Sequence, residues 1–108
     1  MIITPQSAAA VVGSQIMFTC KSDNNSIARW EFLEPGGGAE AELLFGTGGY
    51  VPTQTNTSKN YTVNIRSRGI SDLLISNLKL SDAGKYICKE AGTAAVDRAE
   101  LVVLGNIV

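Results

Sequence analysis

The segment LSDAGKYIC, Leu80 to Cys88, decides how this chain folds. Its aspartate, glycine, tyrosine and cysteine follow one another at every second position, at Asp82, Gly84, Tyr86 and Cys88. Side chains alternate between the two faces of a β-strand, so this spacing predicts a strand whose inner face carries Tyr86 and Cys88. A wide ring and a sulfur would then face the core together, and the sulfur needs a partner from elsewhere in the chain.

Cys20 is the second of the two cysteines and lies 68 positions before Cys88. The sequence contains no C-x-x-C pair and no histidine, which argues against a zinc site and against a redox pair. One long-range disulfide fits this pattern, and two buried free thiols are the alternative. In the chain-entropy model, a bridge of this span removes roughly 4 kcal/mol of conformational freedom from the unfolded chain.

The composition limits the chain to one compact domain. It has 108 residues, of which 44% are hydrophobic, and its net charge of −1 gives no broad field that would attract nucleic acid or anionic lipid. No apolar run approaches the roughly 18 residues of a membrane span, and the first ten residues lack the pattern of a signal peptide. We expect a single domain over residues 1–105, with residues 106–108 beginning a linker to further modules of a secreted or membrane-anchored protein.

Apolar residues recur with a period of two along most of the chain, and turn residues interrupt them about every ten positions. This pattern predicts an all-β chain of about nine strands packed as two sheets in a sandwich. The residues expected to face the core are Ile16, Phe18, Cys20, Trp30, Phe32, Tyr61, Val63, Ile65, Leu73, Ile75, Leu78, Tyr86 and Cys88.

With Cys20, Trp30 and Cys88 placed in this way, the chain resembles a variable-type domain of the immunoglobulin superfamily. The stretch DAGKYIC resembles the family's strand F motif, Cys20 its strand B cysteine, and Trp30 the strand C tryptophan that packs on the bridge. WEFLEPG resembles the W-(Y/F)-x-x-x-P-G stretch, and ELLF resembles strand C′. The resemblance covers nearly the whole chain and implies a Greek-key β-sandwich with one inter-sheet disulfide.

The resemblance also implies roles for the other residues of the motif. Tyr86 would be the tyrosine whose hydroxyl ties the turn before strand F to the backbone, and Gly84 would let that turn pass close by. Asp82 would pair with a basic residue at the start of strand D, but Asn60 occupies that position. A basic residue nearby would have to replace it, the candidates being Lys59, Arg66 and Arg68.

One departure from the family bears on function. Antigen receptors carry a Phe-Gly-x-Gly bulge at the start of strand G, and AGTAAVDRAEL contains none. The loop between strands F and G is also short. The chain therefore resembles a germline-fixed adhesion or innate recognition domain more than a rearranging antigen receptor.

The sequence gives little support for an enzymatic function. Without histidine, a serine or cysteine nucleophile lacks its usual base. Glu40 and Glu42 would share one face of a strand, but alternating charge on an exposed edge is the commoner reason for such a pair. The glycine-rich stretches PGGGAEAE and GTGG open no helix and fit turns better than phosphate loops. We expect no catalytic residue, no cofactor and no metal site.

Three Asn-x-Ser/Thr sequons begin at Asn24, Asn56 and Asn60 and favour a secretory route, although such triplets also arise by chance in polar loops. Asn56 and Asn60 would lie near the edge formed by strands C″ and D. Glycans there would leave the sheet of strands G, F, C and C′ open for contact.

That sheet is also where the alternation leaves a candidate partner-binding face. Its outward residues are Arg29, Glu31 and Leu33 on strand C, Lys85, Ile87 and Lys89 on strand F, and on strand C′ either Leu43 and Phe45 or Leu44. Apolar residues surrounded by charges are typical of an interface, and a solvated face with scattered apolar residues is the alternative. A two-fold arrangement would set Glu31 against Lys85 or Lys89 of a second copy.

These features predict an extracellular recognition or adhesion module that binds another protein, or a second copy of itself, and no nucleic acid. Two alternatives stay open. One is a structural spacer in a tandem array of such domains. The other is a secreted innate immune domain that binds a carbohydrate, for which Tyr50 and Phe45 are the available aromatic residues.

Overall fold

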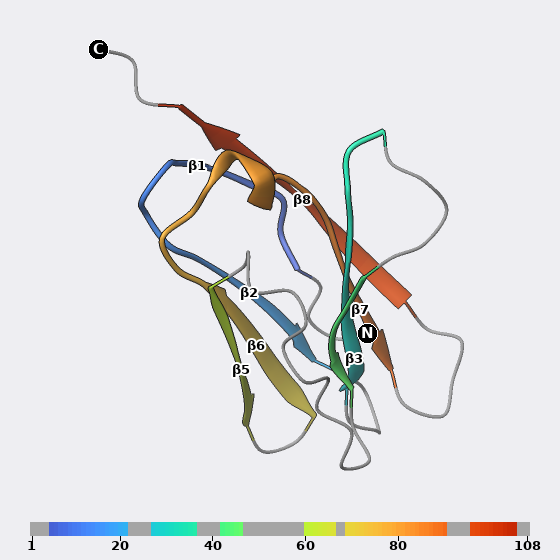
Figure 1. The fold of residues 1–108 in the computed structure, drawn as a ribbon. Helices are drawn as coiled ribbons and strands as arrows, with labels where there is room; N and C mark the ends of the chain where they lie inside the picture. Colours follow the sequence, from blue (N-terminus) through green and yellow to red (C-terminus); the bar gives the residue numbers. More distant parts are fainter. Residues whose placement is uncertain are drawn as a thin grey trace.

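The computed structural model describes residues 5–21, 27–36, 42–46, 60–66, 69–90 and 96–105. Within these ranges the chain forms eight strands and one short 3-10 helix (Figure 1), namely β1 (Ala8–Val11), β2 (Ile16–Lys21), β3 (Ile27–Leu33), β4 (Glu42–Gly46), β5 (Tyr61–Arg66), β6 (Ile70–Ile75), η1 (Leu80–Asp82), β7 (Gly84–Glu90) and β8 (Val96–Leu104). The prediction of an all-β chain is confirmed. The short edge strand expected in GGYVP lies outside the described residues.

The strands form two sheets that face each other, as the sandwich prediction requires (Figure 1). The five-stranded sheet has the order β1-β8-β7-β3-β4, and the three-stranded sheet has the order β2-β6-β5. All paired strands run antiparallel except β1 and β8, which run parallel. Strands distant in sequence therefore lie side by side, and β1 and β8 join the two ends of the described chain.

The core lies between the sheets and confirms most of the predicted alternation. Its buried members are Phe18, Cys20, Trp30, Phe32, Leu44, Leu73, Ile75, Leu78, Tyr86, Cys88, Ala99, Leu101 and Val103. Ile16, Tyr61 and Val63 are partly buried and pack against this cluster. The side chain of Ile65 lies outside the described part of the structure.

The disulfide predicted between Cys20 and Cys88 is present and ties β2 of one sheet to β7 of the other. Beside it, Trp30 is completely buried, and its indole Nε1 donates a hydrogen bond of 3.0 Å to Ser71 Oγ. Trp30 belongs to β3 and Ser71 to β6, so this bond also crosses between the sheets. A covalent bond and a buried polar contact thus fix the separation of the sheets at the centre of the core.

The turn that leads into β7 is held by hydrogen bonds at Asp82. The Tyr86 hydroxyl donates to the Asp82 carbonyl oxygen at 2.6 Å, and the Lys79 backbone N–H donates to the Asp82 carboxylate at 2.8 Å. Asp82 is buried, with 1% of its surface exposed. The basic residues considered as its partner, Lys59, Arg66 and Arg68, lie wholly or by their side chains outside the described part, so that pairing stays a prediction.

Gly84 follows this turn at the start of β7 and has a φ of 151°. A Cβ at this position would lie 2.5 Å from the Leu33 carbonyl oxygen and 2.7 Å from a ring carbon of Phe32. Both the backbone conformation and the close approach of β3 therefore require glycine. This requirement explains why the DAGKYIC motif has a glycine at its third position.

A β-bulge in β4 settles the register that the sequence left open. Phe45 pairs with Trp30 and Leu43 pairs with Glu31, which leaves Leu44 as the extra residue between them. Leu44 is buried, and Phe45 is partly buried and packs against the core. Neither of the two alternatives for the outward residues of this strand, Leu43 with Phe45 or Leu44, is therefore correct, because the bulge interrupts the alternation on which both rest. The assignment of Phe45 to the partner-binding face is wrong.

Candidate functional site

The candidate site is the outer face, by which we mean the side of the five-stranded sheet that points away from the three-stranded sheet. Residues opposite one another in neighbouring strands share a face, so the register defines its members. They are Arg29, Glu31 and Leu33 of β3, Lys85, Ile87 and Lys89 of β7, Val96, Arg98, Glu100, Val102 and Leu104 of β8, and Ala9 and Val11 of β1.

Six of the seven residues proposed from the sequence share the outer face. The cross-strand pairs are Arg29 with Lys89, Glu31 with Ile87 and Leu33 with Lys85. Phe45 is the exception because it packs against the core.

Glu31 is at the centre of an ion-pair cluster on the outer face. Its Oε2 lies 3.2 Å from Arg29 Nη1, and its Oε1 lies 3.2 Å from Lys89 Nζ. The Glu31 side chain is 10% exposed, whereas those of Arg29 and Lys89 are 46% and 41% exposed. Each carboxylate oxygen thus has a cation from its own chain. A Glu31–Lys89 contact between two copies would have to replace a contact that already exists.

Ile87 lies on the outer face as predicted, but only 8% of it is exposed. The residues opposite it in register are Glu31 on one side and Arg98 on the other, and both carry longer side chains. The sequence suggested an exposed apolar centre with charges around it. In the structure the centre is covered, so the accessible surface at this point is polar.

Strand β8 and strand β1 contribute members of the outer face that the sequence analysis did not name. In β8, Arg98, Glu100, Val102 and Leu104 alternate with the buried Ala99, Leu101 and Val103, so the alternation could have found them. Val11 could not have been found in this way, because its place beside Leu104 depends on the long-range pairing of β1 with β8.

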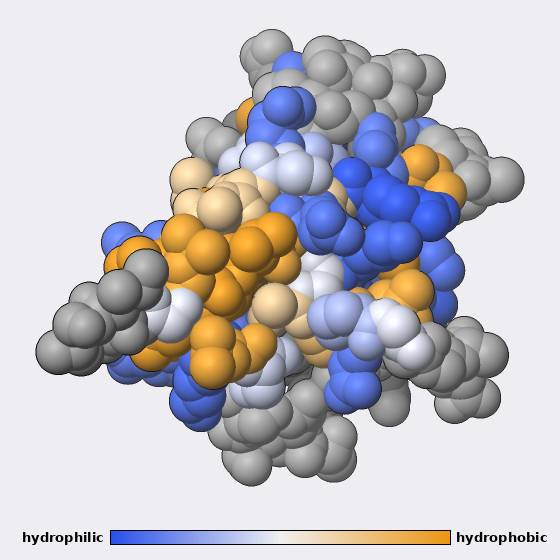
Figure 2. All heavy atoms as spheres, turned by 90° about the horizontal axis from the view of Figure 1, so that it is seen from above, coloured by the Kyte–Doolittle hydropathy of each residue, from blue (hydrophilic) through white to orange (hydrophobic). Residues whose placement is uncertain are grey.

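The outer face divides into two halves of different character. We call Arg29, Glu31, Ile87, Lys89 and Arg98 the charged half. Among these described residues, three positive side chains face one negative side chain, a net charge of +2. Figure 2 shows a blue, hydrophilic region of the surface beside an orange, hydrophobic one, in keeping with this division.

We call Val11, Leu33, Val102 and Leu104 the apolar half. Val11, Val102 and Leu104 are 49%, 45% and 49% exposed, and Val11 lies opposite Leu104 in register. Six large hydrophobic residues are exposed in the described part of the chain, and three of them are gathered here.

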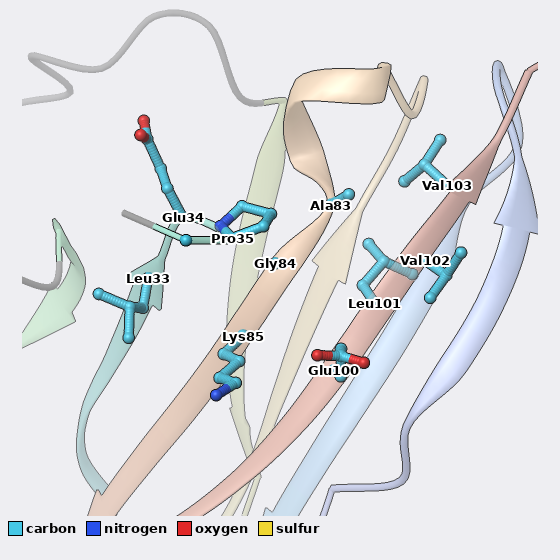
Figure 3. A pocket seen from close by; sticks show the side chains of 11 residues that line it. Leu33, Glu34, Pro35, Ala83, Gly84, Lys85, Glu100, Leu101, Val102 and Val103 are labelled. Carbon is cyan, nitrogen blue, oxygen red and sulfur yellow. The ribbon is translucent and has the colours of Figure 1, made fainter. Parts of the chain in front are cut away.

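A groove of about 600 Å³ runs beside the apolar half, between the end of β3 and strand β8. Leu33 and Pro35 lie on one side and Val102 on the other, with Lys85 and Glu100 near one end (Figure 3). Lys85 and Glu100 are opposite each other in register. Within the described ranges, no ion pair joins them.

The remaining predicted positions lie away from the outer face or outside the described residues. Asn60 is exposed just before β5, in the three-stranded sheet, and its carbonyl oxygen accepts a hydrogen bond from the Ser76 N–H at 2.8 Å. Asn24 and Asn56 lie outside the described residues. In the part of the chain that the structure describes, no cluster of acidic or cysteine side chains has the arrangement of a metal site. No helix found there has the length and apolar character needed to cross a membrane.

Solved structures similar to this chain are immunoglobulin-like domains. A chain from a study of T cell specificity and activation by the bacterial superantigen toxic shock syndrome toxin-1 is 19% identical, with a TM-score of 0.69 over 93% of this chain and 94% of that one. A chimeric titin Z1Z2 is 20% identical, with a TM-score of 0.62 over 95% and 90%. An IG27 protein domain is 14% identical, with a TM-score of 0.63 over 95% and 93%. At sequence identities of 14–20%, the structural similarity establishes the fold and nothing further.

Comparison of the sequence with protein-family models identifies the family of this chain. No curated protein matches the chain significantly. The family model of the immunoglobulin V-set domain matches residues 3–103, nearly the whole chain, and this range includes both cysteines, Trp30 and the DAGKYIC motif. The chain belongs to the immunoglobulin V-set family.

Proposed function

We propose that this domain recognises another protein outside the cell and that it does so through the outer face of the five-stranded sheet. V-set domains are protein-binding modules that are generally not enzymes, and those with a disulfide are typically extracellular. The observation that carries the proposal is the composition of the outer face. It combines a groove, a cluster of exposed aliphatic residues and a set of fixed charges on one continuous sheet surface.

The ion-pair cluster supports this role because it holds two cations in place before a partner arrives. Glu31 restrains Arg29 and Lys89, both of which stay nearly half exposed. Binding then costs less side-chain entropy than it would with freely rotating arginine and lysine side chains. A polar region of fixed geometry next to an apolar one is the arrangement expected of a specific protein interface.

The opposite side of the sandwich offers fewer of these features. On the three-stranded sheet, Met17 is the one exposed large apolar residue among the described residues, and the residue opposite it in register, Leu74, is partly buried. Thr62 and Asn64 of β5, on the same side of that sheet, are exposed and polar. A glycan at Asn60 would add further cover to that sheet and leave the outer face open. Glycosylation at Asn24, Asn56 and Asn60 is part of the proposal and favours a secretory route.

Carbohydrate recognition has less support as the main function. Such sites generally present exposed aromatic rings, and the two candidates considered from the sequence were Tyr50 and Phe45. Phe45 packs against the core, and Tyr50 lies outside the described residues.

The proposal is tested with a biotinylated domain assembled into tetramers on streptavidin and applied to a panel of cell lines, with binding measured by flow cytometry. Arg98→Glu changes an exposed residue of the outer face, and Met17→Glu is the control on the three-stranded sheet, where it leaves all three sequons intact. We expect Arg98→Glu to reduce staining of responsive cells severalfold and Met17→Glu to leave it unchanged. Equal staining by both variants, with loss of staining on substituting the loop residues Asn25 or Thr93, would place recognition at the loops instead.

A further inference from the structure

The charged half of the outer face is positive, although the chain as a whole is not. Its three cations, on Arg29, Lys89 and Arg98, accompany the one carboxylate of Glu31 and leave a net charge of +2, whereas the whole chain has a net charge of −1. The side chains of Arg29 and Lys89 are 46% and 41% exposed, and Arg98 is exposed as well. Exposed cations gathered on one region of an otherwise negative chain point to an anionic ligand.

The register places the three cations in a row across adjacent strands. Arg29 of β3 lies opposite Lys89 of β7, and Arg98 of β8 lies opposite Ile87, two positions from Lys89. The Cβ atoms of opposite residues in a sheet are about 5 Å apart, and those of diagonal neighbours about 7–8 Å apart. The row therefore crosses the strands, and its cations are close enough together to bind successive charges of one extended anion.

All three cations can bind an anion while Glu31 keeps its contacts. Its two carboxylate oxygens lie 3.2 Å from Arg29 Nη1 and 3.2 Å from Lys89 Nζ. A guanidinium and an ammonium each carry several N–H donors, so one contact with Glu31 leaves donors for a second acceptor. Within the described ranges, the Arg98 guanidinium has no carboxylate partner.

The charged half lacks the apolar centre that a protein contact needs. Ile87 is its one aliphatic residue and is only 8% exposed, so a ligand there would bury little apolar surface. Protein interfaces are apolar at their centre and depleted of charge there. The described members of the outer face include no aromatic residue on which a neutral sugar could stack. A hydrated polyanion fits this region better, because it binds through its charges and by the release of counterions.

We propose that the charged half binds a sulfated polysaccharide of the glycosaminoglycan class, with Arg29, Lys89 and Arg98 contacting its sulfate and carboxylate groups. Disulfide-bonded domains of this family are typically extracellular, and sulfated polysaccharides are the linear polyanions of that compartment. The inference goes beyond the proposed function, because the ligand is not a protein and needs neither the groove nor the apolar half.

Binding of the purified domain to immobilised heparin, measured by surface plasmon resonance, tests the proposal. We expect Arg98→Gln to weaken binding about threefold, the effect of losing one exposed ion pair, and Arg29→Gln/Arg98→Gln to weaken it about tenfold. Lys85→Gln is the matched control. It removes the same charge from the same face, but Lys85 lies opposite Glu100 and outside the row, so we expect binding to stay unchanged. Thermal melts check that each variant remains folded.

The salt dependence and a second polyanion sharpen the test. The logarithm of the affinity should fall linearly with the logarithm of the salt concentration, and each lost contact should lower the slope by up to about 1. Absence of heparin binding at about 150 mM salt, where exposed charges are screened beyond roughly 8 Å, would overturn the proposal. An equal loss in Lys85→Gln and Arg98→Gln would do the same. Equal affinity for duplex DNA and heparin would overturn the assignment to a sulfated polysaccharide.

Treatment of cells with heparin lyases separates this inference from the proposed function, because the enzymes remove the polysaccharide and leave surface proteins in place. Tetramer staining that survives the lyases, combined with no binding to heparin, overturns the inference and leaves the proposed function standing. Staining that the lyases abolish, combined with heparin binding that depends on Arg98, supports the inference and contradicts recognition of a protein. If Arg98→Gln changes neither heparin binding nor cell staining, both proposals fail.

Discussion

Gly84 and Tyr86 fix the start of β7 in different ways. Tyr86 holds the preceding turn through its hydrogen bond to the Asp82 carbonyl oxygen. Gly84 allows β3 to approach the backbone more closely than any side chain would permit. The glycine and the tyrosine of the motif therefore both stabilise the turn before β7. The glycine does so because it has no side chain to collide with β3, and the tyrosine does so through the hydrogen bond of its hydroxyl.

Substitution of Gly84 by alanine should lower the free energy of unfolding by about 2–4 kcal/mol, because the new methyl group meets the Leu33 carbonyl oxygen and the backbone conformation is strained. The matched control is Gly13→Ala. Gly13 also has a positive φ, of 90°, but no atom within 4 Å of the added Cβ, so only the backbone strain of roughly 1 kcal/mol applies. Urea unfolding of both variants gives the difference. Equal losses would show that crowding by β3 contributes nothing.

At the scale of the element, β7 is covered on both of its faces, as are the middle of β3 and the middle of β6. Tyr86 and Cys88 are buried in the core, and Ile87 between them is buried on the outer face. β7 lies between β8 and β3 in the five-stranded sheet, so it has a hydrogen-bonded neighbour on each side. A strand enclosed on four sides should be among the last to open.

We expect Ile87→Asp to destabilise the domain by about 3 kcal/mol or more, because a carboxylate would replace a buried aliphatic side chain directly opposite the carboxylate of Glu31. Lys85→Asp, two positions away on the same strand and face, is the control, since Lys85 is exposed. Thermal melts should show a large loss for the first variant and a small one for the second. Comparable melting temperatures would mean that the outer face opens readily around Ile87.

The elements also show how far the sequence determines the fold and the site. The alternation around Phe18, Trp30 and Tyr86 was sufficient to place these side chains in the core, because each strand there is regular. It failed at Phe45, because the bulge adds an extra residue to β4 and no local sequence pattern indicates that bulge. It also missed Val11 and the burial of Ile87, since both depend on which strands become neighbours and how long the adjoining side chains are.

At the scale of the whole molecule, the bridge between Cys20 and Cys88 joins the two sheets across a chain separation of 68. Trp30 packs in the same core cluster and bonds to Ser71 across the sheets. The bridge restricts the unfolded chain, and the buried tryptophan stabilises the folded one. The two contributions are distinct and can be separated by experiment.

Replacement of both cysteines by alanine should lower the free energy of unfolding by about 2–5 kcal/mol, mainly through the greater freedom of the unfolded chain. Guanidinium unfolding of the double variant and of the parent measures the loss. Reduction of the parent should give a loss of similar size if loop closure dominates. A double variant as stable as the parent would contradict a stabilising role for the bridge.

The parallel pairing of β1 with β8 has a mechanical consequence. β1 precedes all other described strands and β8 follows them, so opposite pulls on the start of β1 and the end of β8 act along the axes of the two strands. The four residue pairs from Ala8–Leu101 to Val11–Leu104, with the hydrogen bond from Val12 N–H to the Leu104 carbonyl, then bear the load together instead of opening one after another. Loading of this kind is shear, and it gives the domain resistance to tension between the start of β1 and the end of β8.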